Sequence, residues 1–319
     1  MTSALRFPAW TICLFLLSTV QSQALSIQGY SAEVHDRFSS GYPTTPVPNA
    51  SVNFIGKDFD WSGVGWDASN SARSVTLINS SHFVGAYHFS PSIGATINFF
   101  DPATATILSR TVTSYIDLTD PFDDGITQRT DLRVGVLSAP LPPSIATYPI
   151  LTLNTLGDYV NLDILTYGQS ARIGTNTIDG FASINMYNGN GTPLDASDDF
   201  VQLPSAESPV VADGFILTFD QDMSTGESVA QFGDSGSPTF VPWGGGLALV
   251  SIHSAVGGLT TIDTFIPAYL DQFDSNSIVY TTVPEPASLP LLMLSLFIWL
   301  MLMSRKGPQA GLSRRCGKA

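Results

Sequence analysis

The sequence predicts an all-β protein, on the basis of its composition and of the pattern of its apolar residues. The chain of 319 residues contains 27 Gly and 21 Pro, and aromatic residues make up 11% of it. This turn-rich mixture is typical of β proteins and argues against a helical bundle or a coiled coil. The central region shows no sustained 3.6-residue apolar period, and short β-rich runs recur there between turn residues. Such runs lie at 74–78, 106–108, 134–137 and 247–252, which is typical of a sandwich or a barrel.

The charge balance excludes one large class of partner. The chain carries 27 acidic against 13 basic residues, for a formal net charge of −14. An acidic surface repels phosphate, so we expect no nucleic-acid partner. Apolar residues make up 44% of the chain, which is enough for a sizeable core and argues against global disorder.

The first residues are typical of an export signal. Arg6 precedes an apolar stretch from Ala9 to Val20, and the segment ends in Ser22-Gln23-Ala24, with small residues where a signal peptidase cleaves. We therefore predict a signal peptide over residues 1–24. A transmembrane helix is the alternative, but the apolar run is too short to span a bilayer. Residues 25–50, rich in Ser and Pro, are expected to form a surface segment.

The middle of the chain divides into two β-rich halves. Pro140, Pro142 and Pro143 interrupt it near its centre. We place a first β unit at residues 51–139, a linker at 140–149 and a second β unit at 150–282. Cys13 and Cys316 both lie in the end segments. The mature domain is therefore expected to have neither a disulfide nor thiolate chemistry.

Residues 283–319 have the order of a sorting signal. Pro284-Glu285-Pro286 is followed by an apolar run over 289–303 and by a basic tail. The run is long enough for a short transmembrane helix, and the trailing positive charge keeps the tail cytoplasmic. This order resembles the PEP-CTERM signal of bacterial surface and exopolysaccharide proteins.

That resemblance implies a partner and a location. In the family, a membrane transpeptidase called exosortase recognises the Pro-Glu-Pro motif and removes the helix. We expect the protein to cross the inner membrane, to exist transiently as a membrane-anchored precursor, and to reach the cell surface or extracellular matrix of a Gram-negative-type bacterium. A plain C-terminal anchor is the alternative.

The stretch from Phe232 to Pro238 is the strongest candidate for chemistry. Ser235 lies on a Gly-rich turn, where the N–H groups of Gly233 and Ser235 could converge on one point. Such a pair stabilises an oxyanion, and Gly233 has no Cβ to crowd it. An ordinary Gly/Ser turn is the alternative.

A serine nucleophile needs a base, and four histidines are available. His88 follows a predicted strand, a turn and the small residues Gly85 and Ala86, which would hold an imidazole closely. We expect His82 to be solvated in the turn. His35 carries no such signal, and His253 lies beside the strand that follows the serine, where it is either structural or in contact with the site.

An orienting carboxylate completes the expected set. Asp131 leads into an apolar strand, where a buried carboxylate would fix the tautomer of an imidazole. Four rival acids lie in the same stretch: Asp117, Asp120, Asp123 and Asp124. Arg133 shares a strand face with Asp131, and a guanidinium that pointed at this carboxylate would weaken it as a partner of the imidazole; the sequence leaves open whether it does.

The order His88, Asp131, Ser235 resembles the chymotrypsin/trypsin-like serine proteases over about residues 55–275. The resemblance rests on Ala86-Tyr87-His88, on the strand that Asp131 opens, and on Gly233-Asp234-Ser235-Gly236, after which Ser237 replaces a glycine. Tyr167-Gly168 and the run 250–254 resemble two further family segments. The resemblance implies two Greek-key six-stranded β-barrels with the active site between them.

The same resemblance implies a monomeric endopeptidase that acts on protein or peptide substrates and requires no cofactor. It places Val229, Ala230 and Ser254 at the substrate, where the absence of a carboxylate predicts a small or apolar P1 residue. Phe89 stands where the family usually has a cysteine. No activation site is visible, so we expect activity without proteolytic activation, with Asp234 held by backbone donors or by a cation such as Arg172.

Two questions stay open at the level of the sequence. Oxygen donors gather in one Gly-rich loop, where either a structural Ca²⁺ site or a solvated acidic loop fits. These donors are Asn188, Asn190, Asp195, Asp198 and Asp199. No zinc ligand set and no phosphate-binding loop is found. The second question is functional, because a catalytically inactive barrel could instead bind partners at a surface or in a matrix.

Overall fold

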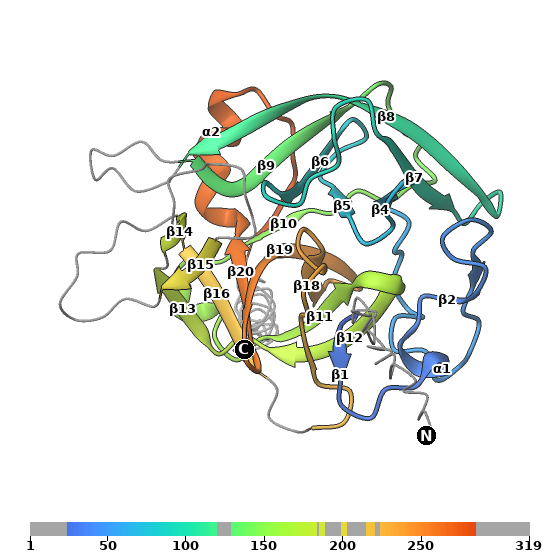
Figure 1. The fold of residues 1–319 in the computed structure, drawn as a ribbon, viewed down its shortest axis with the longest axis horizontal. Helices are drawn as coiled ribbons and strands as arrows, with labels where there is room; N and C mark the ends of the chain where they lie inside the picture. Colours follow the sequence, from blue (N-terminus) through green and yellow to red (C-terminus); the bar gives the residue numbers. More distant parts are fainter. Residues whose placement is uncertain are drawn as a thin grey trace, which may run out of the picture.

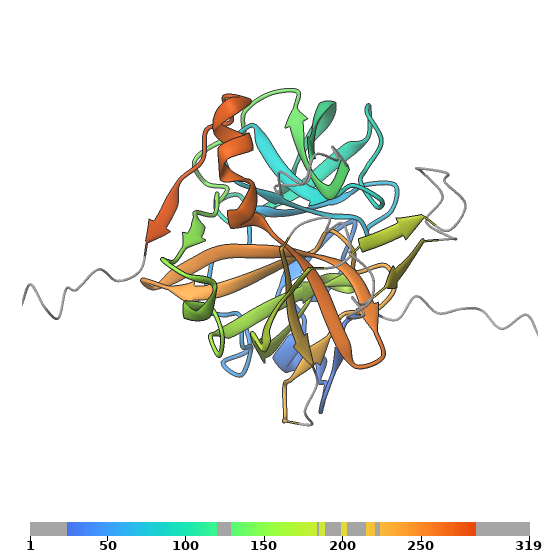
Figure 2. The same ribbon diagram turned by 90° about the vertical axis from the view of Figure 1, so that its left-hand side faces the viewer.

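The computed structural model describes residues 24–119, 129–183, 185–188, 199–202, 215–220 and 224–284. Within these ranges the chain is mostly β, as predicted, and its helices are short. They are α1 (Ala32–His35), α2 (Leu270–Ser275) and the 3-10 turns η1 (Leu156–Asp158), η2 (Gln169–Ala171) and η3 (Ile266–Tyr269). The strands form a closed barrel and a larger sheet, which occupy the upper and lower parts of Figure 2.

The first half is a closed barrel with the strand order β4-β5-β6-β9-β8-β7, antiparallel throughout. Its strands are β4 (Val64–Asp67), β5 (Ser74–Leu77), β6 (His82–Ala86), β7 (Thr96–Asp101), β8 (Thr106–Thr119) and β9 (Arg129–Leu137). Alternate side chains point inward, and Val75, Phe83 and Phe99 are fully buried there. A Cβ at Gly135 would lie 2.0 Å from the Phe83 ring, so glycine is required where β9 crosses that ring.

The second half is a nine-stranded sheet with the main order β12-β11-β18-β19-β20-β16-β13. These strands are β11 (Asp163–Gly168), β12 (Arg172–Thr177), β13 (Gly180–Ser183), β16 (Phe215–Asp220), β18 (Pro238–Trp243), β19 (Gly246–Gly257) and β20 (Thr260–Phe265). β10 (Ile150–Thr152) joins it in parallel to β19 and to β21 (Thr282–Pro284). Where a second six-stranded barrel is expected, the described strands form this nine-stranded sheet, in which the Asn176 side chain of β12 donates to the carbonyl oxygen of Asp220 in β16 at 2.6 Å.

The segment 25–50 is more than a surface wrap. It contains β1 (Ser26–Ile27), β2 (Phe38–Ser40) and β3 (Val47–Pro48); β2 pairs with β3, and β1 pairs with β17 (Ser228–Val229). Leu25 is 1% exposed. The buried Arg37 donates from Nη1 to the carbonyl oxygen of Val64 at 2.9 Å, and the same atom lies 3.5 Å from the hydroxyl of Tyr167. This segment therefore ties the barrel to the sheet.

Aromatic side chains fill the junction between the two halves. The ring of Trp61 lies 6.0 Å from that of Tyr167 and 5.7 Å from that of Phe240. Tyr148, in the predicted linker 140–149, packs 4.6 Å from Phe240 and donates its hydroxyl to the carbonyl oxygen of Asp60. Because buried aromatic side chains contribute strongly to packing, this junction holds the barrel and the sheet in one relative position.

α2 lies against the ends of β8 and β9 (Figure 1). The Gln272 side chain accepts a hydrogen bond from the backbone N–H of Thr119 at 2.9 Å and donates to its carbonyl oxygen at 2.8 Å. Nearby, the hydroxyls of Thr130 and Tyr269 are 2.6 Å apart. α2 thus holds the end of β8 through Gln272, and the preceding turn η3 holds the start of β9 through Tyr269.

Both predicted sorting segments fall mainly outside the described residues. Of the predicted signal peptide only Ala24 is described, and of the Pro-Glu-Pro motif only Pro284, at the end of β21. Glu285, Pro286 and the run 289–303 lie beyond. In the part of the chain that the structure describes, no helix is long and apolar enough to cross a membrane.

Candidate active site

Strand pairing in the barrel brings His88 to Asp131. Ala86 of β6 is paired with Leu132 of β9, which places Tyr87 opposite Asp131 and His88 directly after it. The backbone N–H of Tyr87 donates to the carbonyl oxygen of Asp131 at 2.6 Å, and that of His88 donates to Oδ1 of Asp131 at 3.0 Å. His88 Nδ1 lies 2.8 Å from Oδ1 and 2.9 Å from Oδ2 of the same carboxylate.

The loop between β17 and β18, residues 230–237, brings Ser235 to the same histidine. We call it the nucleophile loop, after the role expected of Ser235. His88 Nε2 lies 2.9 Å from Ser235 Oγ. Gly236 has a φ of +82°, and a Cβ there would lie 3.1 Å from the backbone nitrogen of Ala86. The loop from the sheet is therefore pressed against β6 of the barrel, and only a glycine fits this approach.

These contacts assign the proton positions. An ionised carboxylate only accepts hydrogen bonds, so Nδ1 of His88 carries the proton and Nε2 is left to accept the hydroxyl proton of Ser235. The side chain of Asp131 is 8% exposed and that of His88 is 20% exposed. The carboxylate is thus sheltered, while the imidazole stays accessible to a substrate.

Arg133 pairs with Asp117 rather than with Asp131, which answers the question that strand alternation leaves open. Asp117 of β8 lies directly opposite Arg133 in the ladder, and its Oδ1 is 2.6 Å from Arg133 Nη2. The guanidinium also lies 3.7 Å from the centre of the Tyr115 ring. The cross-strand pair holds the cation away from Asp131.

The same pair occupies Asp117, one of the four acids that rivalled Asp131 for the role of orienting carboxylate. The remaining three lie outside the described residues: Asp120, Asp123 and Asp124. Among the described acids, Asp131 is therefore the one that meets the imidazole of His88.

The backbone at Gly233 is shaped as an oxyanion site requires. Gly233 has a φ of +95°, which favours glycine. The N–H groups of Asp234 and Gly236 donate to the carbonyl oxygens of Gln231 and His253. Among the described residues, the N–H groups of Gly233 and Ser235 have no acceptor. Two N–H groups of this turn are thus available to an incoming carbonyl oxygen.

Asp234 is held by backbone donors rather than by Arg172. Its Oδ1 accepts the N–H of Gln169 and its Oδ2 accepts the N–H of Gln231, both at 2.7 Å. Arg172 instead lies 3.7 Å from a carboxylate oxygen of Asp36. Burial is the main cause that raises the pKa of Asp234 to about 6, against these hydrogen bonds and the charges of His253 and Arg172.

This raised pKa predicts a pH-dependent stability. The carboxyl of Asp234 titrates near 3.8 when unfolded and about 6 when folded, so its contribution to stability is present below the lower value and is lost as the pH rises through the higher one. Relative to Asp234→Asn, the wild-type chain should lose about 2 kcal/mol of unfolding free energy between pH 4 and pH 7. Urea unfolding of both proteins measures this difference; an identical difference at the two pH values would contradict it.

A second imidazole, that of His253, lies buried beneath the nucleophile loop. His253 Nδ1 is 2.6 Å from Oδ1 of Asp263, and Nε2 is 3.0 Å from the carbonyl oxygen of Tyr167. Both partners only accept, so both ring nitrogens donate and His253 is an imidazolium. Burial opposes the charge, but Asp263, Asp234 and the Tyr167 carbonyl together raise the pKa of His253. Of the two roles that the sequence allows for His253, the structure supports the structural one, as a support for the loop.

Removal of Asp263 should destabilise the protein. Its Oδ2 also accepts the hydroxyls of Thr239 and Ser251, at 2.5 and 2.7 Å. Asp263→Leu removes the acceptor of the buried His253 Nδ1 and of two hydroxyls, for which we expect a loss of about 3–5 kcal/mol of unfolding free energy. Asp263→Asn, which keeps an acceptor for the hydroxyls, should cost less. Urea unfolding compares the two; equal stability of Asp263→Leu and wild type would refute the expectation.

The residues expected at the substrate lie near the loop but are covered in this structure. Val229 and Ala230 are each 1% exposed, and Ala230 packs with Leu25 and Ile27 of the N-terminal segment. Ser254 is 5% exposed and its Oγ lies 2.5 Å from the Thr264 hydroxyl. Their role in substrate binding stays a prediction.

The proposed calcium loop is only partly described. Asn188 and Asp199 are backbone partners in the ribbon of β14 (Asn185–Asn188) and β15 (Asp199–Gln202), and the other three donors lie outside the described residues. Within the described ranges, no group of three or more His, Cys, Asp and Glu side chains is placed to hold a metal ion.

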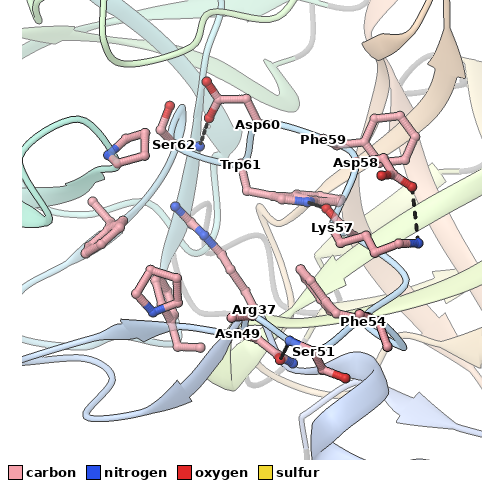
Figure 3. A pocket seen from close by; sticks show the side chains of 17 residues that line it. Arg37, Asn49, Ser51, Phe54, Lys57, Asp58, Phe59, Asp60, Trp61 and Ser62 are labelled. Carbon is pink, nitrogen blue, oxygen red and sulfur yellow. Dashed lines mark hydrogen bonds and ion pairs between the residues drawn. The ribbon is translucent and has the colours of Figure 1, made fainter.

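A pocket of about 710 Å³ lies along residues 37–62 and beside Phe100 and Pro102. It is separate from His88, Asp131 and Ser235, which we call the triad. Figure 3 shows the Arg37 side chain within it, close to the ring of Trp61, and the ion pair of Lys57 with Asp58 at one side. None of His88, Asp131 and Ser235 lines it.

Comparison with known proteins adds little about function. No protein family model and no curated protein sequence matches the chain. Solved structures do match, among them a mutant of human heparin binding protein, with a TM-score of 0.45 and 13% identity over 70% of this chain and 95% of that chain. At this level of similarity the chemistry has to be inferred from the triad itself.

Gln169 is the residue near the site that sequence reasoning missed. It follows Tyr167-Gly168, and the two residues after it, Ser170 and Ala171, have φ values of 60° and 57° although neither is a glycine. No local sequence pattern predicts these positive φ values, because they depend on tertiary contacts.

Proposed function

We propose that the chain is a serine endopeptidase of the chymotrypsin/trypsin-like kind. The observation that carries the proposal is one hydrogen-bonded line: the carboxylate of Asp131, the imidazole of His88 and the hydroxyl of Ser235, joined at 2.8 and 2.9 Å. Three side chains far apart in the sequence meet here with the acceptor and donor roles that nucleophilic catalysis needs.

The proposed reaction follows from these roles. Ser235 Oγ attacks a peptide carbonyl carbon while its proton passes to His88 Nε2, and the oxyanion is stabilised by the N–H groups of Gly233 and Ser235. His88 then gives the proton to the leaving amine, the peptide C–N bond breaks, and an acyl-enzyme remains. Water then attacks the acyl carbonyl carbon and gives a proton to His88 Nε2. That proton passes to Ser235 Oγ as the ester C–O bond breaks, which releases the carboxylic acid and restores the serine. Asp131 orients the ring and stabilises the imidazolium in both halves.

The expected substrate, cofactor and location are part of the same proposal. The protein acts as an exported monomer on protein or peptide substrates with a small or apolar P1 residue, and it needs no cofactor; a structural Ca²⁺ is a separate option. The sequence of the two ends supports a signal peptide and an exosortase-processed Pro284-Glu285-Pro286 signal. Mass spectrometry of the C-terminus of the exported protein tests that processing.

Labelling with a fluorophosphonate probe tests the enzymatic proposal. The probe attaches covalently to an activated serine, so the wild-type chain should be labelled and Ser235→Ala should not. Ser237→Ala is a matched control, since it removes a neighbouring hydroxyl that is fully buried; its labelling should persist. If the folded wild-type chain stays unlabelled, an inactive binding protein is the better interpretation.

A further inference from the structure

We propose that Gln169 is the positioning residue that sets the oxyanion site, by holding the peptide between Phe232 and Gly233 in one orientation. The inference deepens the proposed function and rests on it. Gln169 Nε2 donates to the carbonyl oxygen of Phe232 at 2.9 Å. Gln169 is only 5% exposed, so water does not readily replace this donor.

The planarity of the peptide turns that bond into an orientation. In a trans peptide the C=O and the following N–H point in opposite directions. Since the Phe232 oxygen faces Gln169, the N–H of Gly233 faces away from it. Without the bond, rotation about the dihedral angles that flank this peptide would exchange the two groups and turn a carbonyl oxygen toward the incoming oxyanion.

Steric contacts enforce the same arrangement. A Cβ on Gly233 would lie 2.3 Å from Gln169 Nε2, so the side-chain amide packs directly on the glycine. The glycine has a φ of +95°, a conformation that other residues rarely adopt. The sequence thus offers this amide the one residue type that allows it to approach.

Gln169 also holds the other part of the loop. Its own N–H donates to Asp234 Oδ1 at 2.7 Å, while its side chain binds Phe232. Behind it, the carbonyl oxygen of Ala171 accepts the N–H of the buried Arg37 at 2.9 Å. Gln169 therefore holds the nucleophile loop on both sides of Gly233, at Phe232 and at Asp234. An oxyanion site held in this way needs no cleavage event to form it.

Gln169→Met tests this role. Methionine keeps the length of the side chain and removes its donor, and the backbone N–H to Asp234 remains. Since loss of one oxyanion donor costs about 10²–10³ in kcat, we expect kcat per titrated active site to fall by at least about tenfold. Affinity for a peptide boronic acid, which forms a tetrahedral adduct, should fall in parallel. KM and the pH midpoint of kcat/KM, set by His88, should stay near their wild-type values.

Gln272→Met is the matched control. It removes the same kind of donor, which Gln272 makes to the carbonyl oxygen of Thr119 at 2.8 Å, on α2 away from the triad. It should leave kcat per site unchanged even where it lowers the melting temperature. A purely structural role of Gln169 would give the same pattern as this control.

Crystal structures of wild type and Gln169→Met distinguish the inference about Gln169 from the proposed peptidase activity. A flipped Phe232–Gly233 peptide bond in the variant supports the inference, whether or not the wild-type protein cleaves peptide substrates. An unmoved peptide together with an unchanged kcat per site overturns it. A wild type that is folded, with its peptide held as described, but inert toward fluorophosphonates and peptides contradicts the proposed function alone.

Discussion

His88→Ala and Ser235→Ala are each expected to lower kcat for peptide hydrolysis by about 10⁶-fold. Each change removes one end of the 2.9 Å contact between His88 Nε2 and Ser235 Oγ, and without it the hydroxyl cannot lose its proton as it attacks. Initial rates on a quenched fluorescent peptide library, with concentrations corrected for folded protein, measure the effect.

The two changes should not add. Either single change already removes the activation of the Ser235 hydroxyl. The double variant should therefore have about the same kcat as each single variant. His82→Ala is the matched control, because His82 lies on β6, the strand that leads to His88, and its Nδ1 contacts only the Asn79 side chain, at 3.1 Å, among the contacts described. A loss of activity in His82→Ala equal to that in His88→Ala would contradict the assignment of the base.

Asp131→Asn is expected to lower kcat by about 10⁴-fold. The asparagine amide donates to Nδ1 of His88, where the carboxylate accepted at 2.8 Å. The ring proton then moves to Nε2, which can no longer accept the proton of Ser235. KM should change little, since Asp131 contacts the ring and not the substrate; a steady-state comparison of kcat and KM tests this.

The control for that variant is the acid beside it on the next strand. Asp117→Asn weakens the pair with Arg133, which is held at 2.6 Å. Its kcat should stay within about twofold of wild type, because isolated surface pairs contribute little. If Asp117→Asn were the more damaging change, the orienting carboxylate would have been assigned to the wrong strand.

Which parts of the site the sequence predicts follows from how local each signal is. A glycine-flanked serine, and a histidine preceded by small residues, are determined by the local backbone they require, and both are readable along the chain. Asp131 is readable because it opens an apolar strand. The sequence leaves the partner of Arg133 open, because strand alternation gives the face of a side chain but not the cross-strand neighbour that it binds. Here that neighbour is Asp117, directly opposite.

The larger architecture shows the same division. The short β-rich runs predict strands, and each lies within or largely within one of them: β5, β8, β9 and β19. The closure of strands into a barrel depends on pairings between distant segments, so the first half closes while the described strands of the second half extend into a nine-stranded sheet. The segment 25–50, polar enough to suggest a surface wrap, buries Leu25 and Arg37 because the barrel and the sheet provide partners for them.

By itself, the sequence determined that this chain is mostly β and which histidine, acid and serine are chemically suited to act together. The tertiary structure alone decided how the loop that carries Ser235 is held: by the N–H groups of Gln169 and Gln231 on Asp234, by the amide of Gln169 on Phe232, and by the imidazolium of His253 beneath. The physical reason is that a nucleophile's identity lies in its own atoms, whereas its support consists of hydrogen bonds to whatever backbone the fold brings within about 3 Å.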